Sequence, residues 1–492
     1  MSEHIAKSRF VNRLFEMIIP IMSWTIITFP LWMSPFHPAL VAYFIIAFDL
    51  YFFYSCVRTV YYSTLSYRMI EEHDKIDFSK LVSTASNAKN IHHFIIIPNY
   101  KESLQKLEET ITAIVSNDFP YKTISLVLAF EEREPAAHMK GIAVKQKYGH
   151  FFEDVLCTYH ALEPHEVAGK ASNQTHAAKQ VDAYIAEKGW HPKNVIITIC
   201  DADSKLPKNF FSYLTYTYIN DVDNAYHFYW APVLLYNNFW KLSFFVRIQA
   251  TLSSILRLSF LSQKDKLIQI STYSTNMWLL KQINFWDVDV IPEDWHVYFQ
   301  AFFVFGEKVK TLPLYTIVSG DAIYTGKIIS TFVNRYEQEK RWAWGVSDIG
   351  YSLKKFFITP HINAFAKIRK ILYLIENHLF WPTSFFILTI SASIPPLINP
   401  VFKRTVLGFL LPQLSGVILT FSTSMILVYV YLDVKLRQKI KIYTKLVSFP
   451  LIFIQWYFLP LISFFLSSLP ALESHTRMIF GKKIKYKVTE KK

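Results

Sequence analysis

Two neighbouring carboxylates in the segment CDADS are the first residues of this sequence whose types and spacing could do chemistry. Asp201 and Asp203 follow an apolar stretch of strand length, and alternation along an extended chain would place both side chains on one side. Two close carboxylates repel each other unless a cation accompanies them, so the pair predicts a site for a hard divalent metal ion. Asp-x-Asp triplets also occur in ordinary solvated turns, and that alternative remains open.

A second acidic pair lies in VIPEDW. Glu293 and Asp294 stand between the apolar Ile291 and the aromatic Trp295, surroundings that could raise the pKa of a carboxyl towards that of a general base. The same residues also suit a helix start, because a proline fits the first turn and acids favour the positive end of the helix dipole. Both interpretations can hold together.

A third group lies in EQEKRWAWG. Gln338, Arg341 and Trp342 are spaced i, i+3 and i+4, which places an amide, a guanidinium and an indole on one face of a helix. Such a face could hold a diphosphate and offer a flat apolar plate to a sugar ring. The alternative is an interfacial helix whose aromatic residues anchor it at a membrane surface.

Strands alternate with helices between these groups, which predicts a mainly parallel α/β sheet covered on both faces. We expect strands at residues 92–98, 123–130, 155–162 and 194–200, and helices at 103–116 and 171–188. In such sheets ligands bind beyond the carboxyl ends of the strands. The polar segments PNYKE, EERE and CDADS begin at those ends.

Apolar runs near both ends of the chain predict an integral membrane protein. Of the 492 residues 52% are hydrophobic and 17% aromatic, and five runs approach or exceed the roughly 20 residues that cross a bilayer core. These runs are 14–33, 39–57, 379–398, 406–432 and 446–469. We expect a hairpin at 1–60, a catalytic domain at 61–370, a membrane region at 371–470 and a basic tail at 471–492.

Basic residues predict which side of the membrane the central domain occupies. Lysines and arginines precede the first and third apolar runs, and short basic loops stay in the cytosol. The central domain is therefore expected to be cytosolic. Pro450 and Pro460 interrupt the last run, so it could be re-entrant or bent, and we expect a cytosolic tail. The segment 237–263 suits either a helix along the membrane surface or a core helix.

The net charge of +14 is largely explained by residues that flank the apolar runs, and no nucleic-acid-binding motif accompanies it. We therefore expect no nucleic-acid partner. The chain has three cysteines, whose spacing does not suit a metal site, and reduced thiols are the expectation.

The order of these motifs along the chain resembles that of the membrane-embedded family 2 glycosyltransferases, which include cellulose, hyaluronan and chitin synthases. The resemblance implies a GT-A domain that binds a nucleotide-diphosphate sugar, and a UDP-sugar is the first expectation. It implies that Asp201 and Asp203 form the Asp-x-Asp pair, with Asp203 on Mg²⁺ or Mn²⁺. It also implies that Asp294 is the base with Glu293 as its acidic neighbour, and that Gln338, Arg341 and Trp342 form the Gln-x-x-Arg-Trp motif.

Other matches to this family are looser. Lys170 in GKASNQ resembles the lysine of the family's Lys-Ala-x-x-x-Asn stretch, although Asn173 falls early. Tyr100 and Glu102 resemble the opening nucleotide-contact motif. Where the family usually has an aspartate after the second strand, this chain has Glu131 and Glu132, which leaves the identity of the nucleotide open.

The resemblance implies an inverting transferase that elongates a polysaccharide and is coupled to its export through the membrane. Transfer of one sugar to a lipid acceptor is an alternative, because ceramide-type glucosyltransferases resemble the same motif set. A transporter or an inactive membrane subunit is a more remote alternative. Transporters spread their apolar spans through the chain, whereas some 300 residues of α/β pattern separate the two apolar groups here.

Overall fold

The computed structural model describes residues 8–437 and 454–484, and a mixed seven-stranded sheet forms the centre of its α/β part. The strand order is β3-β2-β1-β4-β7-β5-β8, in which only β7 runs antiparallel to its neighbours β4 and β5. The strands are β1 (His92–Asn99), β2 (Ile124–Glu131), β3 (Val155–His160), β4 (Val195–Ile199), β5 (His227–Trp230), β7 (Tyr273–Asn276) and β8 (Lys310–Pro313). A separate pair joins β6 (Val233–Leu234) to β9 (Val318–Ser319).

Continuous apolar sequence explains the central strands. All residues of β2 and β4 are buried, as expected of parallel strands that are covered by helices on both faces. The covering helices include α4 (Phe78–Thr84), α5 (Leu104–Val115), α6 (Ala137–Tyr148), α7 (Lys170–Glu187), α8 (Phe210–Ile219), α10 (Met277–Gln282) and α11 (Glu293–Phe305). The α/β fold between apolar helices, with the four strands and two helices expected from sequence, is confirmed.

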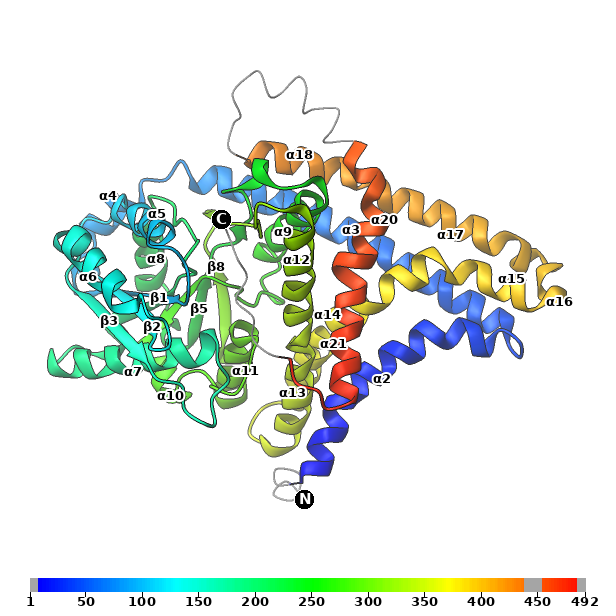
Figure 1. Cartoon of the computed structure of the whole chain (residues 1–492), viewed down its shortest axis with the longest axis horizontal. Coiled ribbons are helices and arrows are strands. Elements are labelled where there is room, and N and C mark those ends of the chain that lie inside the picture. Colours follow the sequence, from blue (N-terminus) through cyan, green and yellow to red (C-terminus); the bar gives the residue numbers. More distant parts are fainter. Residues whose placement is uncertain (1–7, 438–453, 485–492) are drawn as a thin grey trace.

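Six helices are long and apolar enough to cross a membrane, counting only the residues that the structure describes. They are α2 (Arg9–Met33), α3 (Pro38–His73), α9 (Phe244–Leu261), α14 (Ala364–Thr389), the pair α17 (Val406–Ser424) and α18 (Ile426–Leu436), and the segment Gln455–Ile479. The last segment contains α20 (Leu459–Ser463) and α21 (Leu469–Ile479). Most of these helices lie on the opposite side of the molecule from the sheet (Figure 1).

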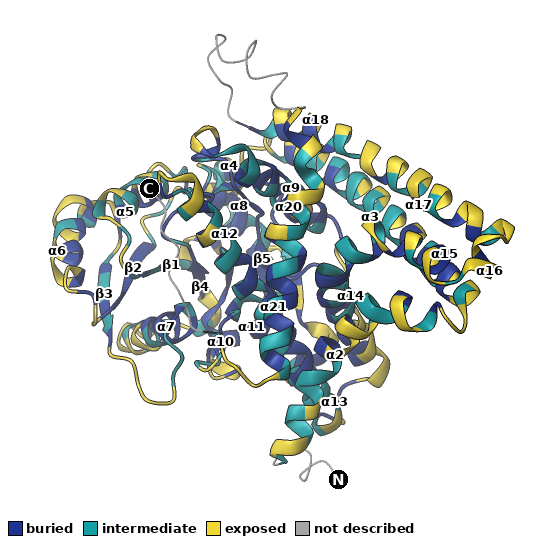
Figure 2. Cartoon of the chain, turned by 45° about the vertical axis from the view of Figure 1, so that its right-hand side comes forward, coloured by how far each residue is buried: buried dark blue, intermediate teal, exposed yellow. Residues whose placement is uncertain are grey.

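Exposure distinguishes these helices from one another. The apolar window of α9 is 61% buried inside the protein, against 22% for α3 and 28% for Val406–Leu436. Helix α17 leaves Val406, Phe409, Val417 and Phe421 exposed, and Figure 2 shows long exposed stretches along it. We conclude that α9 is mainly an interior helix, which agrees with the second of the two expectations for residues 237–263, whereas α17 carries a face suited to lipid.

Helix α3 links the apolar helices to the α/β domain. It is 36 residues long, and its last part carries Arg58, Arg68 and Glu71. It packs along α9, and the Oγ atoms of Ser66 and Ser262 are 2.7 Å apart at the end of that contact. One continuous helix therefore runs from the first apolar hairpin to the α/β side of the molecule.

The third apolar segment differs from the expected one. The sequence predicts a span at 379–398, but α14 begins at Ala364, where the Asn363 side chain caps it by accepting from the Phe365 and Ala366 N–H groups. The helix ends at Thr389, and Pro395 and Pro396 lie in the separate short helix α15 (Ile394–Ile398). Capping and proline positions, rather than the limits of the apolar run, set the ends of this helix.

Three further helices complete the described part: α12 (Ile328–Ala343), α13 (Ser347–Ile358) and α16 (Pro400–Lys403). The three expected domain limits, near residues 60, 370 and 470, fall within the helices α3, α14 and α21. The expectations for Pro450 and for residues 485–492 of the basic tail lie outside the described residues.

A buried ion-pair network joins α11 to α13. The His296 Nδ1 atom is 2.7 Å from Asp348 Oδ1, and its Nε2 atom is 2.9 Å from Asp287 Oδ2. Burial alone would lower the pKa of His296, but the charge of Asp348 and the bonds to both carboxylates raise it to about 9. The protonated imidazole therefore fastens the helix that begins with Glu293 and Asp294.

We expect the His296→Gln substitution to destabilise the protein in a pH-dependent way. Because the folded pKa of about 9 exceeds the unfolded value of 6.5, the stabilisation is complete below pH 6.5 and is lost as the pH rises through 9. The difference from wild type should be on the order of 2–3 kcal/mol at pH 6 and should shrink towards pH 10. Thermal unfolding in detergent across this pH range measures it, and a difference independent of pH would contradict it.

Candidate active site

Lys170 joins three segments of the chain at the carboxyl ends of the strands. It is the first residue of α7, and its Nζ atom lies 2.8 Å from Asp201 Oδ1 and 3.1 Å from Glu293 Oε1. The same ammonium group donates to the carbonyl oxygen of Ser271 at 2.9 Å. Burial alone would lower the pKa of Lys170, but the charges of Asp201 and Glu293 raise it well above its usual value. A lysine cation is thus fixed at the centre of the acidic group.

Asp294 is held by two backbone donors. Its Oδ2 atom accepts from the Ser271 N–H at 2.9 Å, and its Oδ1 atom accepts from the Trp295 N–H at 2.9 Å. Burial raises the pKa of Asp294, and the nearby charge of Lys170 opposes that rise. The carboxylate is therefore oriented, poorly solvated and close to a cation, which are the conditions under which an aspartate serves as a general base.

Ser271 holds both partners through its backbone. Its N–H donates to Asp294 while its carbonyl accepts from Lys170, and its φ angle is +66°. A serine in this left-handed region is sparsely populated and carries strain of order 1–3 kcal/mol. In this strained conformation the backbone of Ser271 forms hydrogen bonds with both Asp294 and Lys170.

Glu293 is the first residue of α11 and is 7% exposed. Burial raises its pKa, and Lys170 opposes the rise. The helix-start interpretation of VIPEDW is therefore correct, and it coexists with the convergence of both acids on Lys170. Glu293 and Asp294 thus stand at one helix end beside one cation.

Asp201 and Asp203 lie in a turn rather than in extended chain. The Ser204 N–H donates to the Asp201 carbonyl at 2.9 Å, so the expected strand alternation does not place these side chains. Asp201 points to Lys170, whereas the Oδ2 atom of Asp203 accepts from the Asp321 N–H at 3.1 Å. The reason is that β4 ends at Ile199, before the acidic residues begin.

The donor set at this turn suits a hard divalent cation such as Mg²⁺ or Mn²⁺, because it offers carboxylate oxygens only. Among the described residues, however, no group of three or more His, Cys, Asp and Glu side chains is arranged to hold a metal ion. Asp201 and Asp203 would therefore share such an ion with oxygens that a ligand supplies.

The Gln-x-x-Arg-Trp segment is helical and lies in α12. The Gln338 Oε1 atom accepts from Arg335, and the Trp342 ring has the Cζ atom of Arg335 4.7 Å from its centroid. The Cζ atom of Arg257 is 5.5 Å from the same centroid. Arg341 is partly exposed near the end of the helix. Two guanidinium groups thus lie at the Trp342 ring, where a sugar was expected from the sequence.

Arg257 connects this helix with the acidic group. It lies on α9, and Asp201 and Asp294 act electrostatically on its guanidinium group. Trp342 on α12 and the two aspartates are therefore neighbours of the same arginine, so the structure brings these motifs to one region. The place of the Arg341 side chain in the site remains a prediction.

The residues expected at the nucleotide end lie in two adjacent loops. The Cζ atom of Arg133 is 4.1 Å from the Tyr100 ring centroid, and Arg133 also pairs with Glu131 at the end of β2. Glu102 Oε2 accepts from the Tyr100 N–H at 2.7 Å, so part of its function is to shape the loop. Glu132 is exposed. Tyr100 and Glu131 are thereby joined through one arginine.

Several residues of the site were not found from the sequence. Arg257, Arg335 and Ser271 carry no motif of their own, and only the fold brings them to the acids and to Trp342. Glu134 and Lys140 form a buried ion pair that supports the loop after β1 through the Lys101 N–H. For this ion pair the sequence offered one signal, Glu134 in EERE, because a third acid in that segment needs a cationic partner if it is buried.

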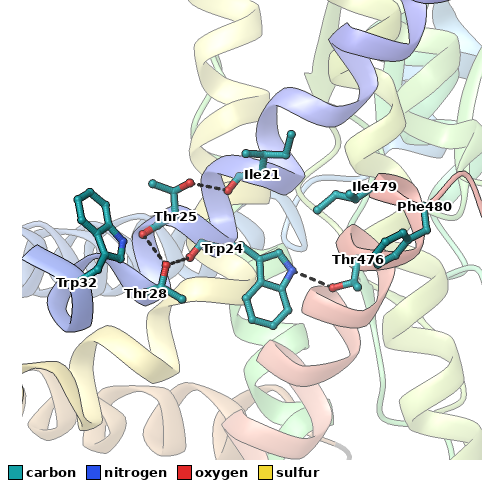
Figure 3. Close-up of a pocket in the computed structure, with 8 residues that line it drawn as sticks. All are labelled: Ile21, Trp24, Thr25, Thr28, Trp32, Thr476, Ile479 and Phe480. Carbon is teal, nitrogen blue, oxygen red and sulfur yellow. Dashed lines mark hydrogen bonds between the residues drawn. The ribbon is translucent and has the colours of Figure 1, made fainter.

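One pocket of the structure lies away from these residues. It has a volume of about 480 Å³ and lies between α2 and α21 (Figure 3). None of the candidate site residues lines it. The Trp24 Nε1 atom donates to Thr476 Oγ1 at 2.9 Å, and the hydroxyl groups of Thr25 and Thr28 donate to the α2 backbone. The pocket has no charged lining residue, and we assign it no part in the chemistry.

Comparisons with known proteins give distant structural likeness only. No family model matches the chain, and no curated protein matches it in sequence. The mannosyltransferase PcManGT from Pyrobaculum calidifontis, solved with GDP-Man and Mn²⁺, is 13% identical over 80% of this chain and 98% of that chain, with a TM-score of 0.40. TarS from S. aureus, solved with UDP-GlcNAc, is 11% identical over 68% of this chain and 90% of that chain, with a TM-score of 0.37. Scores this low carry no argument, and the function is argued from the site.

Proposed function

We propose that this protein is a membrane-embedded glycosyltransferase that moves a sugar from a nucleotide-diphosphate donor to a growing polysaccharide, with inversion at the anomeric carbon. One observation carries the proposal. Asp201 lies about 90 residues before the adjacent pair Glu293 and Asp294 in the sequence. In the structure, Asp201 and Glu293 pair with the Lys170 ammonium group, and Asp294 accepts from the backbone of Ser271, which also binds Lys170. They do so at the carboxyl ends of strands, where ligands bind in α/β sheets.

In this proposal Asp294 accepts the proton of the acceptor hydroxyl, because its carboxylate is oriented by two N–H donors and has a raised pKa. Lys170 forms ion pairs with both Glu293 and Asp201, so its positive charge offsets part of the negative charge beside the base. Gln338, Arg341 and Trp342 border the diphosphate, and Tyr100, Glu102, Glu131 and Glu132 lie towards the nucleotide. A divalent cation on Asp201 and Asp203 would supply positive charge to the departing diphosphate.

The membrane setting follows from the basic flanks of the apolar helices, which favour a cytosolic catalytic domain in a plasma or inner membrane. Membranes incubated with sugar nucleotides should incorporate label into high polymer. Label found only in an extractable lipid would overturn the polysaccharide acceptor and leave single-sugar transfer to lipid as the function.

We expect one class of nucleotide sugar to stabilise the purified protein. A donor that binds only the native state and is present at a concentration of 100 times its Kd adds about 2.7 kcal/mol to the free energy of unfolding. This stabilisation appears as a higher melting temperature. Screening UDP- and GDP-sugars with and without Mn²⁺ should give a shift that needs both nucleotide and metal. If no sugar nucleotide shifts the melting temperature under either condition, the transferase proposal is wrong.

A further inference from the structure

Arg257 is a buried cation on α9. Its residue exposure is 6%, and its Nη1 atom donates to the Val233 carbonyl at 2.7 Å. In the part of the chain that the structure describes, its guanidinium group forms no salt bridge with a carboxylate. Buried guanidinium groups are ordinarily paired, because an uncompensated charge is costly to remove from water.

Charges of both signs act on Arg257, since Asp201, Asp294 and Glu339 oppose the effect of Arg335. Arg335 is 1% exposed, lies against the same Trp342 ring and acts electrostatically on Arg257. Glu339 pairs with Arg335, and its Oε1 atom also accepts from Gln249. Among the described residues, Arg335 thus has a carboxylate in a salt bridge, whereas Arg257 has the Val233 carbonyl as its hydrogen-bond acceptor. The Arg335 Nε atom is buried and has no hydrogen-bond partner among the described residues.

An anion at this place would relieve both problems. A guanidinium group offers a planar set of donors that matches phosphate oxygens, and such bonds are among the strongest in proteins. Arg257 already lies close enough to Asp201 and Asp294 to be affected by their charges. An anion bound by Arg257 would therefore lie beside the acids and beside the α12 face that carries Gln338 and Trp342.

We propose that Arg257, supported by Arg335 behind the Trp342 ring, binds the diphosphate of the nucleotide sugar. This inference rests on the proposed function and adds a binding residue that the sequence motifs do not contain. Helix α9 then contributes directly to the donor site, and Trp342 acts as a spacer that holds the two guanidinium groups at fixed positions.

The test compares diphosphate with monophosphate nucleotides. UDP, GDP and their monophosphates UMP and GMP are titrated with Mn²⁺ into purified wild type, Arg257→Gln and Arg257→Lys. We expect Arg257→Gln to raise the Kd of the diphosphate that wild type binds by roughly 10- to 100-fold. The Kd of the matching monophosphate should change by less than about threefold. Arg257→Lys keeps the charge but loses the planar donors, and its diphosphate affinity should be intermediate.

Arg247→Gln is the matched control. Arg247 lies on the same helix, donates to the Leu242 carbonyl at 3.0 Å and packs on Phe239 and Trp240, but its charged neighbours are Arg437 and Asp433. Its substitution should leave the affinity for the diphosphate unchanged.

Three results would overturn the inference, and a fourth decides if Arg257→Gln does not fold. The first is unchanged diphosphate affinity in Arg257→Gln, and the second is equal weakening of diphosphate and monophosphate, which would indicate a structural role. If Arg257→Gln does not fold, the diphosphate-to-monophosphate ratio of Arg257→Lys decides, and a ratio equal to that of wild type refutes the inference. The third is a wild-type protein that binds neither UDP nor GDP, which overturns the proposed function as well.

Discussion

The Asp294→Asn variant is expected to lose most of its turnover while it keeps its affinity for the donor. An amide of the same shape can keep one of the two contacts, with the Ser271 or the Trp295 N–H group, through its single oxygen, but it cannot take a proton from the acceptor hydroxyl. Loss of general-base assistance typically costs about 10²- to 10⁴-fold in rate. Single-turnover measurements with saturating donor would give this loss directly, and donor titration would give the affinity.

Asp289→Asn is a suitable control for this experiment. Asp289 precedes the same helix and is exposed, so its substitution changes the charge of the same loop without touching the cluster around Lys170. Its turnover should equal that of wild type. Normal turnover in Asp294→Asn, with the donor still bound, would remove Asp294 from the chemistry.

The pH dependence of wild-type turnover should reflect the raised pKa of Asp294. Because the base works only when deprotonated, activity should fall as the pH drops through that pKa, at a higher pH than the ordinary aspartate value of about 3.9 would give.

Lys170→Met is expected to have the second large effect, on both stability and chemistry. The substitution removes the cation that pairs with Asp201 and Glu293 and leaves a buried carboxylate without compensation. Breaking a buried ion pair in this way costs about 3–5 kcal/mol. Since Lys170 also opposes the rise of the Asp294 pKa, its loss should raise that pKa further and move the acid limb of the pH–rate profile to higher pH.

Thermal unfolding and a pH–rate profile together test this prediction. Lys179→Met is the control, because Lys179 lies on the same helix α7 with an exposed side chain. A Lys170→Met protein that melts with wild type and shows the same acid limb would mean that the ammonium group does not balance these acids.

Local sequence was sufficient for the strands whose residues are continuously apolar. Strands β1, β2 and β4 could be predicted because both faces are buried, and α5 because Ser103 caps it and accepts from the Lys106 N–H. Strand β7 was missed because its sequence, YSTN, is polar and short. Its place between β4 and β5 comes from pairing with residues about 75 positions away, as in Ile197 with Thr275.

The site shows the same limit. Sequence identified Asp201, Glu293 and Asp294, and it pointed to Lys170, but the geometry assumed for the first pair was wrong because the strand ends before it. The positive φ of Ser271 and the guanidinium group of Arg257 have no local signature. Both matter only because the fold brings Ser271 to Lys170 and Asp294, and Arg257 within reach of the charges of Asp201 and Asp294, which is a tertiary property.

The length of α3 has a mechanical consequence. At 1.5 Å per residue, its 36 residues span about 54 Å, well beyond the roughly 30 Å of a hydrocarbon core. The surplus length continues towards the α/β domain, and α9, which carries Arg257, packs along α3. A change in bilayer thickness that tilts α3 would therefore displace α9 and its arginine relative to the sheet.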